Sequence, residues 1–303
     1  MKSIPVIELN SMISDPHTLV EKSENAYADQ ISRAAERIYR ERRKKPVVLI
    51  SGPSGSGKTT TAGRLARLLE DNGCRAHTIS MDNYFLPLSA DERRLAEEGK
   101  FDFESPKRLD TELFRRHIEF LSRCQPIDVP AFDFTLQDRK PGFRLEYKPG
   151  DIVIMEGIHA LNPDVIGHSD DYTNRVYVSV RTRLESGGEL LHPSKIRLMR
   201  RLIRDKLYRG RSITETMEFF KSVERGEDLY IMPYKHRASF DIDTFIAYEP
   251  MVYRDILLGD LHGVSKTFPE YEKYADIEKF LRELEPLDPA NVPDNSLVRE
   301  FIG

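Results

Sequence analysis

The feature that most constrains this chain is a glycine-rich turn, GPSGSGKT at residues 52–59, between two regular patterns. An apolar, β-branched run at 47–50 precedes the turn and predicts a buried strand. A helical pattern over 60–70 follows, with Leu65, Leu68 and Leu69 on one face. Strand, turn, Lys-Thr and helix in this order match the G-x-x-x-x-G-K-[ST] signature of a phosphate-binding P-loop. The alternative is a chance Gly/Ser turn before a helix, which the two correct flanks disfavour.

The residue types in this turn suit a nucleotide with Mg²⁺. Glycine and serine let backbone N–H groups turn toward phosphate oxygens, and the next helix offers its unpaired N-terminal donors. We therefore predict that Lys58 reaches the β- and γ-phosphates of ATP and that the Thr59 hydroxyl ligates Mg²⁺. The predicted nucleotide-binding residues are Gly52, Ser54, Gly55, Ser56, Gly57, Lys58, Thr59 and Thr60.

Charge and cysteine content argue against several classes of protein. The net charge of −4 provides no general attraction to nucleic acid or to an acidic membrane. Cys74 and Cys124 are the only cysteines, so a disulfide framework is not expected. No stretch approaches the roughly 18–20 apolar residues that cross a bilayer. We expect a soluble cytoplasmic protein with a small-molecule partner and with neither nucleic acid nor membrane as partner; a homo-oligomer stays open.

Strand and helix patterns alternate through most of the chain. This alternation predicts an α/β protein, a P-loop NTPase three-layer fold with a mostly parallel sheet covered on both faces. We predict three parts: a strand/helix extension at 1–45, a P-loop kinase domain at 46–260, and a C-terminal helix and tail at 261–303. Within them, 86–104 reads as a polar, mobile connection, 181–193 as a loop and 286–303 as a proline-containing tail.

Two acidic residues follow predicted strands. Glu156 follows the strand predicted at 151–155, in which residues 152–155 are apolar, and open α/β sheets bind ligands at this end of their strands. We predict that Glu156 acts on Mg²⁺ or its waters; a surface Glu is the alternative. Asp82 follows the strand predicted at 76–81 and is suited to accept the proton of an attacking hydroxyl or to help hold the metal. The Asp-Asn pair there is equally typical of a turn.

Aromatic residues alternate with carboxylates at 101–104 and at 130–134. Such segments suit a pocket that stacks a flat ring and hydrogen-bonds a sugar. Strands whose Phe side chains face the core would show the same alternation, so both interpretations stay open.

The helix predicted at 194–208 is strongly basic. Arg197, Arg201 and Arg204 share one face, and Arg209 and Arg211 follow directly. Like charges stacked in this way repel, so the helix favours a polyanion as partner. We predict a lid at about 193–226 that closes over ATP and supplies arginine to the transition state. A nucleic-acid patch or a solvated helix face are the alternatives.

The ordered motifs resemble those of the uridine kinase and phosphoribulokinase family. They are SGPSGSGKTT, SMDNYF, FDFESPKRLD, PAFDF, VIMEGIHALNP and IRLMRRLIRDKLYRGRS, and they span roughly residues 45–260. The stretches at 222–227 and 230–234 look like a bacterial branch of uridine-kinase-like proteins. In that branch a domain similar to the N-terminal part of threonyl-tRNA synthetase often precedes the kinase, and residues before 46 are too few to contain it.

The resemblance implies ATP-dependent phosphorylation of a hydroxyl, by default the 5′-OH of uridine or cytidine. By position, Asp82 matches the family's catalytic base, Thr59 and Glu156 its Mg²⁺ site, and Lys58 its phosphate-binding lysine. The lid arginines that match are Arg201, Arg204 and Arg211. The predicted catalytic residues are Lys58, Asp82 and Arg204, and the predicted metal-binding residues are Thr59, Glu156 and Asp82.

The nucleoside pocket departs from the family pattern. Glu104 stands where uridine kinases have an Asp, and Phe132 and Gln137 stand where they have a Tyr and a His. Phe219 replaces a Gln, and Ala238-Ser239 replaces an Ala-Asp pair. The predicted substrate-binding residues are Glu104, Phe132, Gln137, Arg201 and Arg211. Because lost hydrogen-bond partners change selectivity, a kinase of another metabolite, such as a sugar phosphate or small alcohol, and a P-loop ATPase switch stay open.

Overall fold

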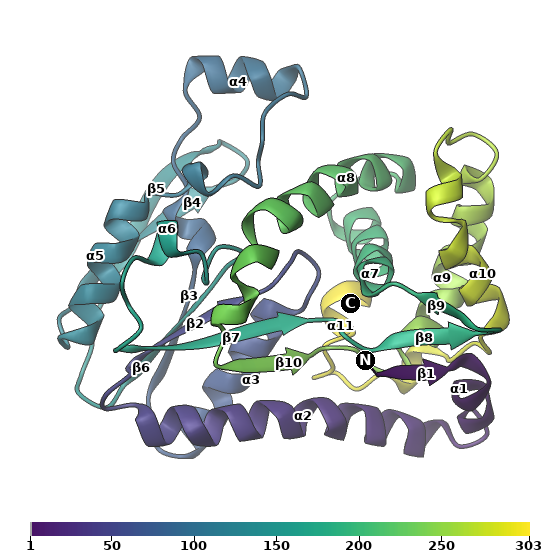
Figure 1. The fold of residues 1–303 in the computed structure, drawn as a ribbon, viewed down its shortest axis with the longest axis horizontal. Helices are drawn as coiled ribbons and strands as arrows, with labels where there is room; N and C mark the ends of the chain where they lie inside the picture. The colour runs from purple at the N-terminus through teal and green to yellow at the C-terminus, as the bar shows by residue number, and fades with distance from the viewer. Residues whose placement is uncertain (1) are drawn as a thin grey trace.

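A five-stranded parallel sheet lies at the centre of the chain. The computed structural model describes residues 2–303. The strand order is β10-β7-β2-β6-β3, with β2 in the middle (Figure 1). The bounds are β2 Val47–Ser51, β3 Ala76–Ser80, β6 Ile152–Glu156, β7 Thr173–Ser179 and β10 Phe240–Asp243. The predicted α/β fold with a parallel sheet is confirmed.

Each face of this sheet is covered by helices, because both faces of its central strands are apolar. Val48 and Ile50 of β2 pack into the larger core with helices α2 (Pro16–Glu41) and α3 (Lys58–Asp71). Val47 and Leu49 point the other way, into a second core that contains α5 (Thr111–Ser122). The alternation of side chains along the strand thus produces three layers.

The other elements surround the carboxyl ends of the strands (Figure 1). Helices α7 (Pro193–Tyr208) and α8 (Ile213–Tyr230) contain the basic segment, and the hairpin of β4 (Ile127–Asp133) and β5 (Asp138–Leu145) lies at the opposite side. The remaining helices are α1 Val6–Met12, α4 Ala90–Glu97, α6 Pro163–Ile166, α9 Glu249–Val264, α10 Ala275–Glu283 and α11 Arg299–Ile302. Within residues 2–303, no helix has the length and apolar character to cross a membrane.

Two segments that were expected to be irregular contain regular structure. The predicted loop at 181–193 forms β8 (Arg183–Ser186) and β9 (Glu189–Leu191), and β8 pairs in parallel with β1 (Ser3–Pro5). Because β1 and β8 lie far apart in the sequence, no local pattern predicts that they pair. The polar connection at 86–104 contains α4, whose capping box joins Ser89 and Glu92.

The expectation of a tail at 286–303 is also wrong. Leu297, Val298 and Phe301 are fully buried, and Leu297 packs against the P-loop. The apolar side chains of this segment follow no helix or strand period, because their burial depends on contacts with distant elements. The boundaries of the three predicted parts stay a prediction.

Candidate active site

A cavity of about 780 Å³ opens at the carboxyl ends of β2, β3 and β6. The P-loop, the segments after β3 and β6, the lid arginines and the C-terminal segment all contribute to its wall. It contains Lys58, Thr59, Asp82, Glu156 and Arg204, so the residues predicted to be catalytic or metal-binding lie together.

The P-loop has the backbone conformation that its glycines allow. Gly55 and Gly57 have φ angles of 76° and 81°, in the left-handed region that favours glycine, and Gly57 caps α3. Lys58 Nζ donates to the carbonyl oxygen of Pro53 at 3.2 Å, so the lysine lies folded against the loop. The start of α3 faces the cavity, as an anion site at a helix N-terminus requires.

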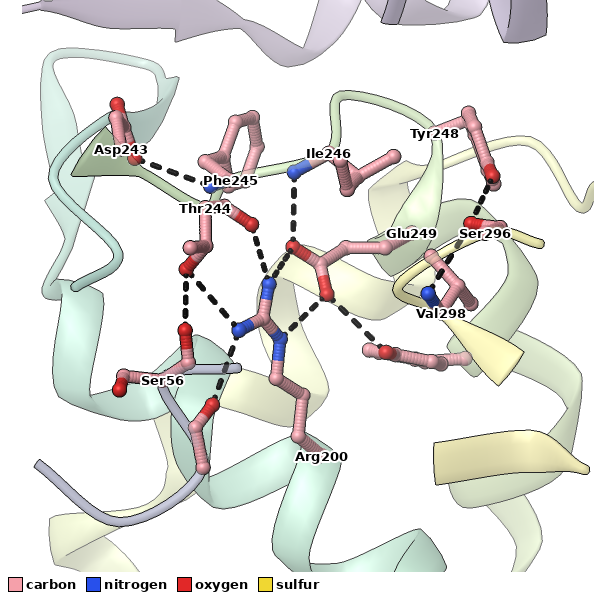
Figure 2. A network of polar contacts seen from close by, with 12 residues as sticks. Ser56, Arg200, Asp243, Thr244, Phe245, Ile246, Tyr248, Glu249, Ser296 and Val298 are labelled. Atoms are coloured by element: carbon pink, nitrogen blue, oxygen red, sulfur yellow. Dashed lines mark hydrogen bonds and ion pairs between the residues drawn. The ribbon is translucent and has the colours of Figure 1, made fainter. Parts of the chain in front are cut away.

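Buried arginines of α7 hold the loop from behind. Arg197 and Arg200 donate to the carbonyl oxygens of Ser54 and Gly55 at 3.2 and 3.0 Å. Arg200 is fully buried and forms a two-point ion pair with Glu249, with both N···O distances 2.8 Å (Figure 2). The expected position of Arg197 on a lid face that receives ATP is therefore wrong; Arg197 and Arg200 support the loop.

This buried pair has a testable effect on stability. We expect Glu249→Gln to lower the free energy of unfolding by about 3–5 kcal/mol, because it leaves the buried Arg200 charge without its partner. The exposed pair of Arg40 and Glu36, at 3.3 Å, provides the control, and Glu36→Gln should cost less than about 1 kcal/mol. Urea unfolding of the two variants measures both values, and equal losses would contradict the role given to Arg200.

Two carboxylates and Lys58 form the charged floor of the cavity. Glu156 is buried at the end of β6, and its Oε1 accepts from Thr59 Oγ1 at 3.2 Å. The Asp82 side chain is open to solvent on the side of the cavity, and protein surrounds the side chain on its other sides. This desolvation, with the nearby Glu156 carboxylate, raises the pKa of Asp82 to about 6, against the opposing charge of Lys58. Desolvation lowers the pKa of Lys58, and the carboxylates oppose that shift.

The donor set here fits Mg²⁺. A hydroxyl and two carboxylates, from Thr59, Glu156 and Asp82, supply hard oxygen ligands. Over the described residues 2–303, no group of three or more His, Cys, Asp or Glu side chains forms a metal cluster. Mg²⁺ usually binds through one or two carboxylates together with substrate phosphates.

The other end of the cavity contains Glu104 and Gln137 beside the rings of Phe85, Phe103 and Phe134. Desolvation raises the pKa of Glu104 to about 7, and Arg201 and Lys58 oppose the shift. Phe132 does not share in this wall: it is buried in β4, edge-on to Phe85 and Phe134 at 5.7 and 5.3 Å between ring centroids. Its predicted contact with substrate is wrong, because the strand turns its ring inward behind the other two.

Four lid arginines converge on one buried carboxylate. Asp205 lies 3.2–3.7 Å from guanidinium nitrogens of Arg201, Arg204, Arg209 and Arg211 and is completely buried. All four arginines line the cavity. Burial lowers the pKa of Arg201 to about 10. The basic segment thus holds these four positive charges together around Asp205.

A model of the phosphoribulokinase/uridine kinase family matches residues 47–247. The chain belongs to this family. Family members are kinases, so the chain is a phosphotransferase, and the predicted resemblance is confirmed. A uridine kinase of Halobacterium salinarum is 31% identical over 195 residues, covering 64% of this chain and 77% of that protein. A uridine kinase of Geobacillus kaustophilus is 32% identical over 197 residues, covering 64% and 84%.

A solved structure with similar topology is the D-glycerate 3-kinase of Cryptococcus neoformans. It is 18% identical, with a TM-score of 0.49 over 67% of this chain and 88% of that one.

Two residues of the site in this chain were not predicted from the sequence. Asp205 was predictable, because it lies four residues from both Arg201 and Arg209 on the basic helix. Glu300 lines the cavity from the C-terminal segment, and no local pattern indicated it. Phe219, interpreted as a lost hydrogen bond, instead lies under the guanidinium groups of Arg201 and Arg211, 5.4 and 5.0 Å from its ring centroid.

Proposed function

We propose that this kinase transfers the γ-phosphoryl group of ATP to the 5′-hydroxyl of a uridine- or cytidine-type nucleoside. The observation that carries the proposal is the convergence of Lys58, Thr59, Asp82 and Glu156 on one cavity beneath the lid arginines. The uridine kinases among its relatives support the acceptor class. The aromatic rings of Phe85, Phe103 and Phe134 in the cavity wall support an acceptor with a ring.

Different residues of the chain have different roles in this reaction. The P-loop N–H groups and Lys58 bind the β- and γ-phosphates, and Asp82 orients the acceptor hydroxyl and takes its proton at a carboxylate oxygen. Arg201, Arg204 and Arg211 stabilise the charge on the transferring group and exclude water when the lid closes. Thr59, Glu156 and Asp82 would hold Mg²⁺, which neutralises phosphate charge when it is bound.

A different acceptor and an ATPase switch without a small acceptor stay as alternatives to this proposal. Glu104 and Gln137 replace typical family residues at the acceptor end of the cavity and would suit a different polyol or sugar phosphate. An ATPase switch has less support, because Asp82 lies in an open cavity large enough for an acceptor. The lid arginines face this cavity around buried Asp205, an arrangement that favours a small anion over nucleic acid.

The proposal is tested by release of ADP from ATP and Mg²⁺ with a panel of nucleosides, sugar phosphates and small alcohols, using Lys58→Ala as the blank. We expect uridine or cytidine to stimulate release strongly. Stimulation by a different compound alone would keep the kinase and replace its acceptor. Slow hydrolysis that no hydroxyl compound changes would support the switch instead.

The raised pKa of Asp82 predicts an acid limb in the pH profile. The base acts in its ionised form, so kcat/KM should be level above about pH 6 and fall about tenfold per unit below it. The Glu104→Gln variant is the control, because it removes the other raised carboxyl and should keep the limb near pH 6. A profile that stays level down to pH 5 would contradict a raised pKa of Asp82 in the working enzyme.

Arg204 has a predicted effect on turnover rather than on affinity. We expect Arg204→Ala to lower kcat by about tenfold or more, because a donor for the transferring group is lost. The Kd for nucleotide should change less than about threefold, since three other lid arginines remain. Steady-state kinetics and calorimetric titration of the same protein measure both quantities. A raised Kd with unchanged kcat would mean that Arg204 only binds nucleotide.

A further inference from the structure

The C-terminal segment at 289–303 lies directly on the P-loop. A Cβ atom added to Gly57 would come within 2.5 Å of Leu297 Cδ1. Phe301 is fully buried, with its ring centroid 5.1 Å from the guanidinium carbon of Arg200. Figure 1 shows α11 beside α7, and in Figure 2 Ser296 and Val298 lie near the network around Arg200. The segment is therefore anchored, although it lies outside residues 47–247 of the family match.

This anchoring places the carboxylate of Glu300 inside the active-site cavity. Glu300 Oε2 accepts a hydrogen bond from Thr60 Oγ1, in the first turn of α3. Glu300 also lines the same cavity as Lys58 and Arg204. Its negative charge acts on both of these cations and favours their charged forms.

A carboxylate at this place competes with phosphate on physical grounds. The first turn of a helix after a glycine-rich loop binds anions through its free N–H groups and its dipole. Thr60 was predicted to contact nucleotide, yet its hydroxyl is already bound by an anion of the chain itself. Phosphate oxygens that approach Thr60 would meet a like charge in a partly dehydrated cavity, where repulsion is poorly screened.

We propose that the C-terminal segment is an autoinhibitory element in which Glu300 is a tethered anion that competes with nucleotide phosphates for Thr60 and the neighbouring cations. The inference rests on the proposed nucleotide site. Glu300 withdraws from Thr60 when nucleotide binds and the last turn at 299–303 loosens with it, while the buried Leu297 and Val298 keep the segment attached. Apparent nucleotide affinity is reduced by the fraction of molecules in which Glu300 occupies the site.

Calorimetric titration with ADP and Mg²⁺ tests this competition. If Glu300 occupies the site in about nine of ten molecules, Glu300→Gln lowers the Kd about tenfold. The matched control is Asp294→Asn, which removes an exposed charge from the same segment and should leave the Kd within about twofold. An unchanged Kd in Glu300→Gln would overturn the proposal. A higher Kd would also overturn it, because Glu300 would then be an ordinary contact to the nucleotide.

Hydrogen exchange of the intact protein supplies a second readout. We expect ADP with Mg²⁺ to speed amide exchange at 299–303, where Glu300 withdraws, and slower or unchanged exchange there would contradict the inference. Should Glu300→Gln fold poorly, Glu300→Asp shortens the reach to Thr60 and should also lower the Kd. Failure of wild-type and variant proteins alike to bind ADP would overturn the nucleotide site itself; binding with equal affinity overturns only the autoinhibition.

Discussion

Replacing Asp82 by asparagine should lower kcat by about 10²–10⁴-fold, the usual contribution of a positioned general base. The amide keeps the shape of the side chain but cannot take the proton of the acceptor hydroxyl. The Kd for nucleotide should change far less, because the P-loop and Lys58 remain. Single-turnover kinetics at saturating ATP and uridine measure the chemical step, and near-normal turnover in the folded variant would refute the assignment.

The free energy of unfolding provides a control for the Asp82→Asn variant. The pKa of Asp82 is raised on folding from 3.8 to about 6, so its ionisation opposes folding, with a cost that grows as the pH rises between these values and is complete above about pH 6. Asp82→Asn should therefore be at least as stable as the wild type at pH 7 without metal or nucleotide. The exposed Asp71→Asn, at the end of α3, should leave both stability and kcat unchanged.

Replacing Lys58 by alanine should lower kcat by about 10²–10³-fold, which is the cost of losing one preorganised donor to developing charge. The ammonium lies in a desolvated cavity, where its interaction with phosphate is stronger than in water. Nucleotide affinity should fall as well, since the lysine contacts the phosphates in both ground and transition states. The phosphate-transfer rate and the Kd for ADP provide the two measurements.

The exposed Lys44, which precedes β2, provides the matched lysine. Lys44→Ala removes the same charge outside the cavity and should keep wild-type kcat and Kd. If Lys58→Ala retained full turnover while remaining folded by circular dichroism, the P-loop would not be the site of transfer.

The core of this fold can be predicted from the sequence because the patterns that indicate its strands and turn lie within short segments. Apolar runs at β2 and β6 indicate buried parallel strands, and the glycines before Lys58 indicate the turn between β2 and α3. The positions of Asp82 and Glu156 follow from the same rule, since carboxyl ends of parallel strands meet at one edge.

The missed features depend on contacts between distant parts of the chain. β1, near the N-terminus, pairs with β8, which lies beyond the middle of the chain, and Glu300 reaches Thr60 from the far end of the chain. Arg200 shows the same limit: helical spacing puts it beside the other arginines, but only the fold reveals its burial against Glu249. Alternation would place Phe132 and Phe134 on the same strand face, but β4 ends at Asp133, so Phe132 is buried in the strand while Phe134 lies exposed in the turn beyond it.

Transfer of radiolabel from γ-labelled ATP to a nucleoside tests the central claim most directly. The account predicts labelled uridine monophosphate from uridine, no product from 5′-deoxyuridine, which lacks the accepting hydroxyl, and almost none from uridine with Asp82→Asn. Label that appears only as inorganic phosphate with every nucleoside, or product formation that is insensitive to Asp82→Asn, would contradict it.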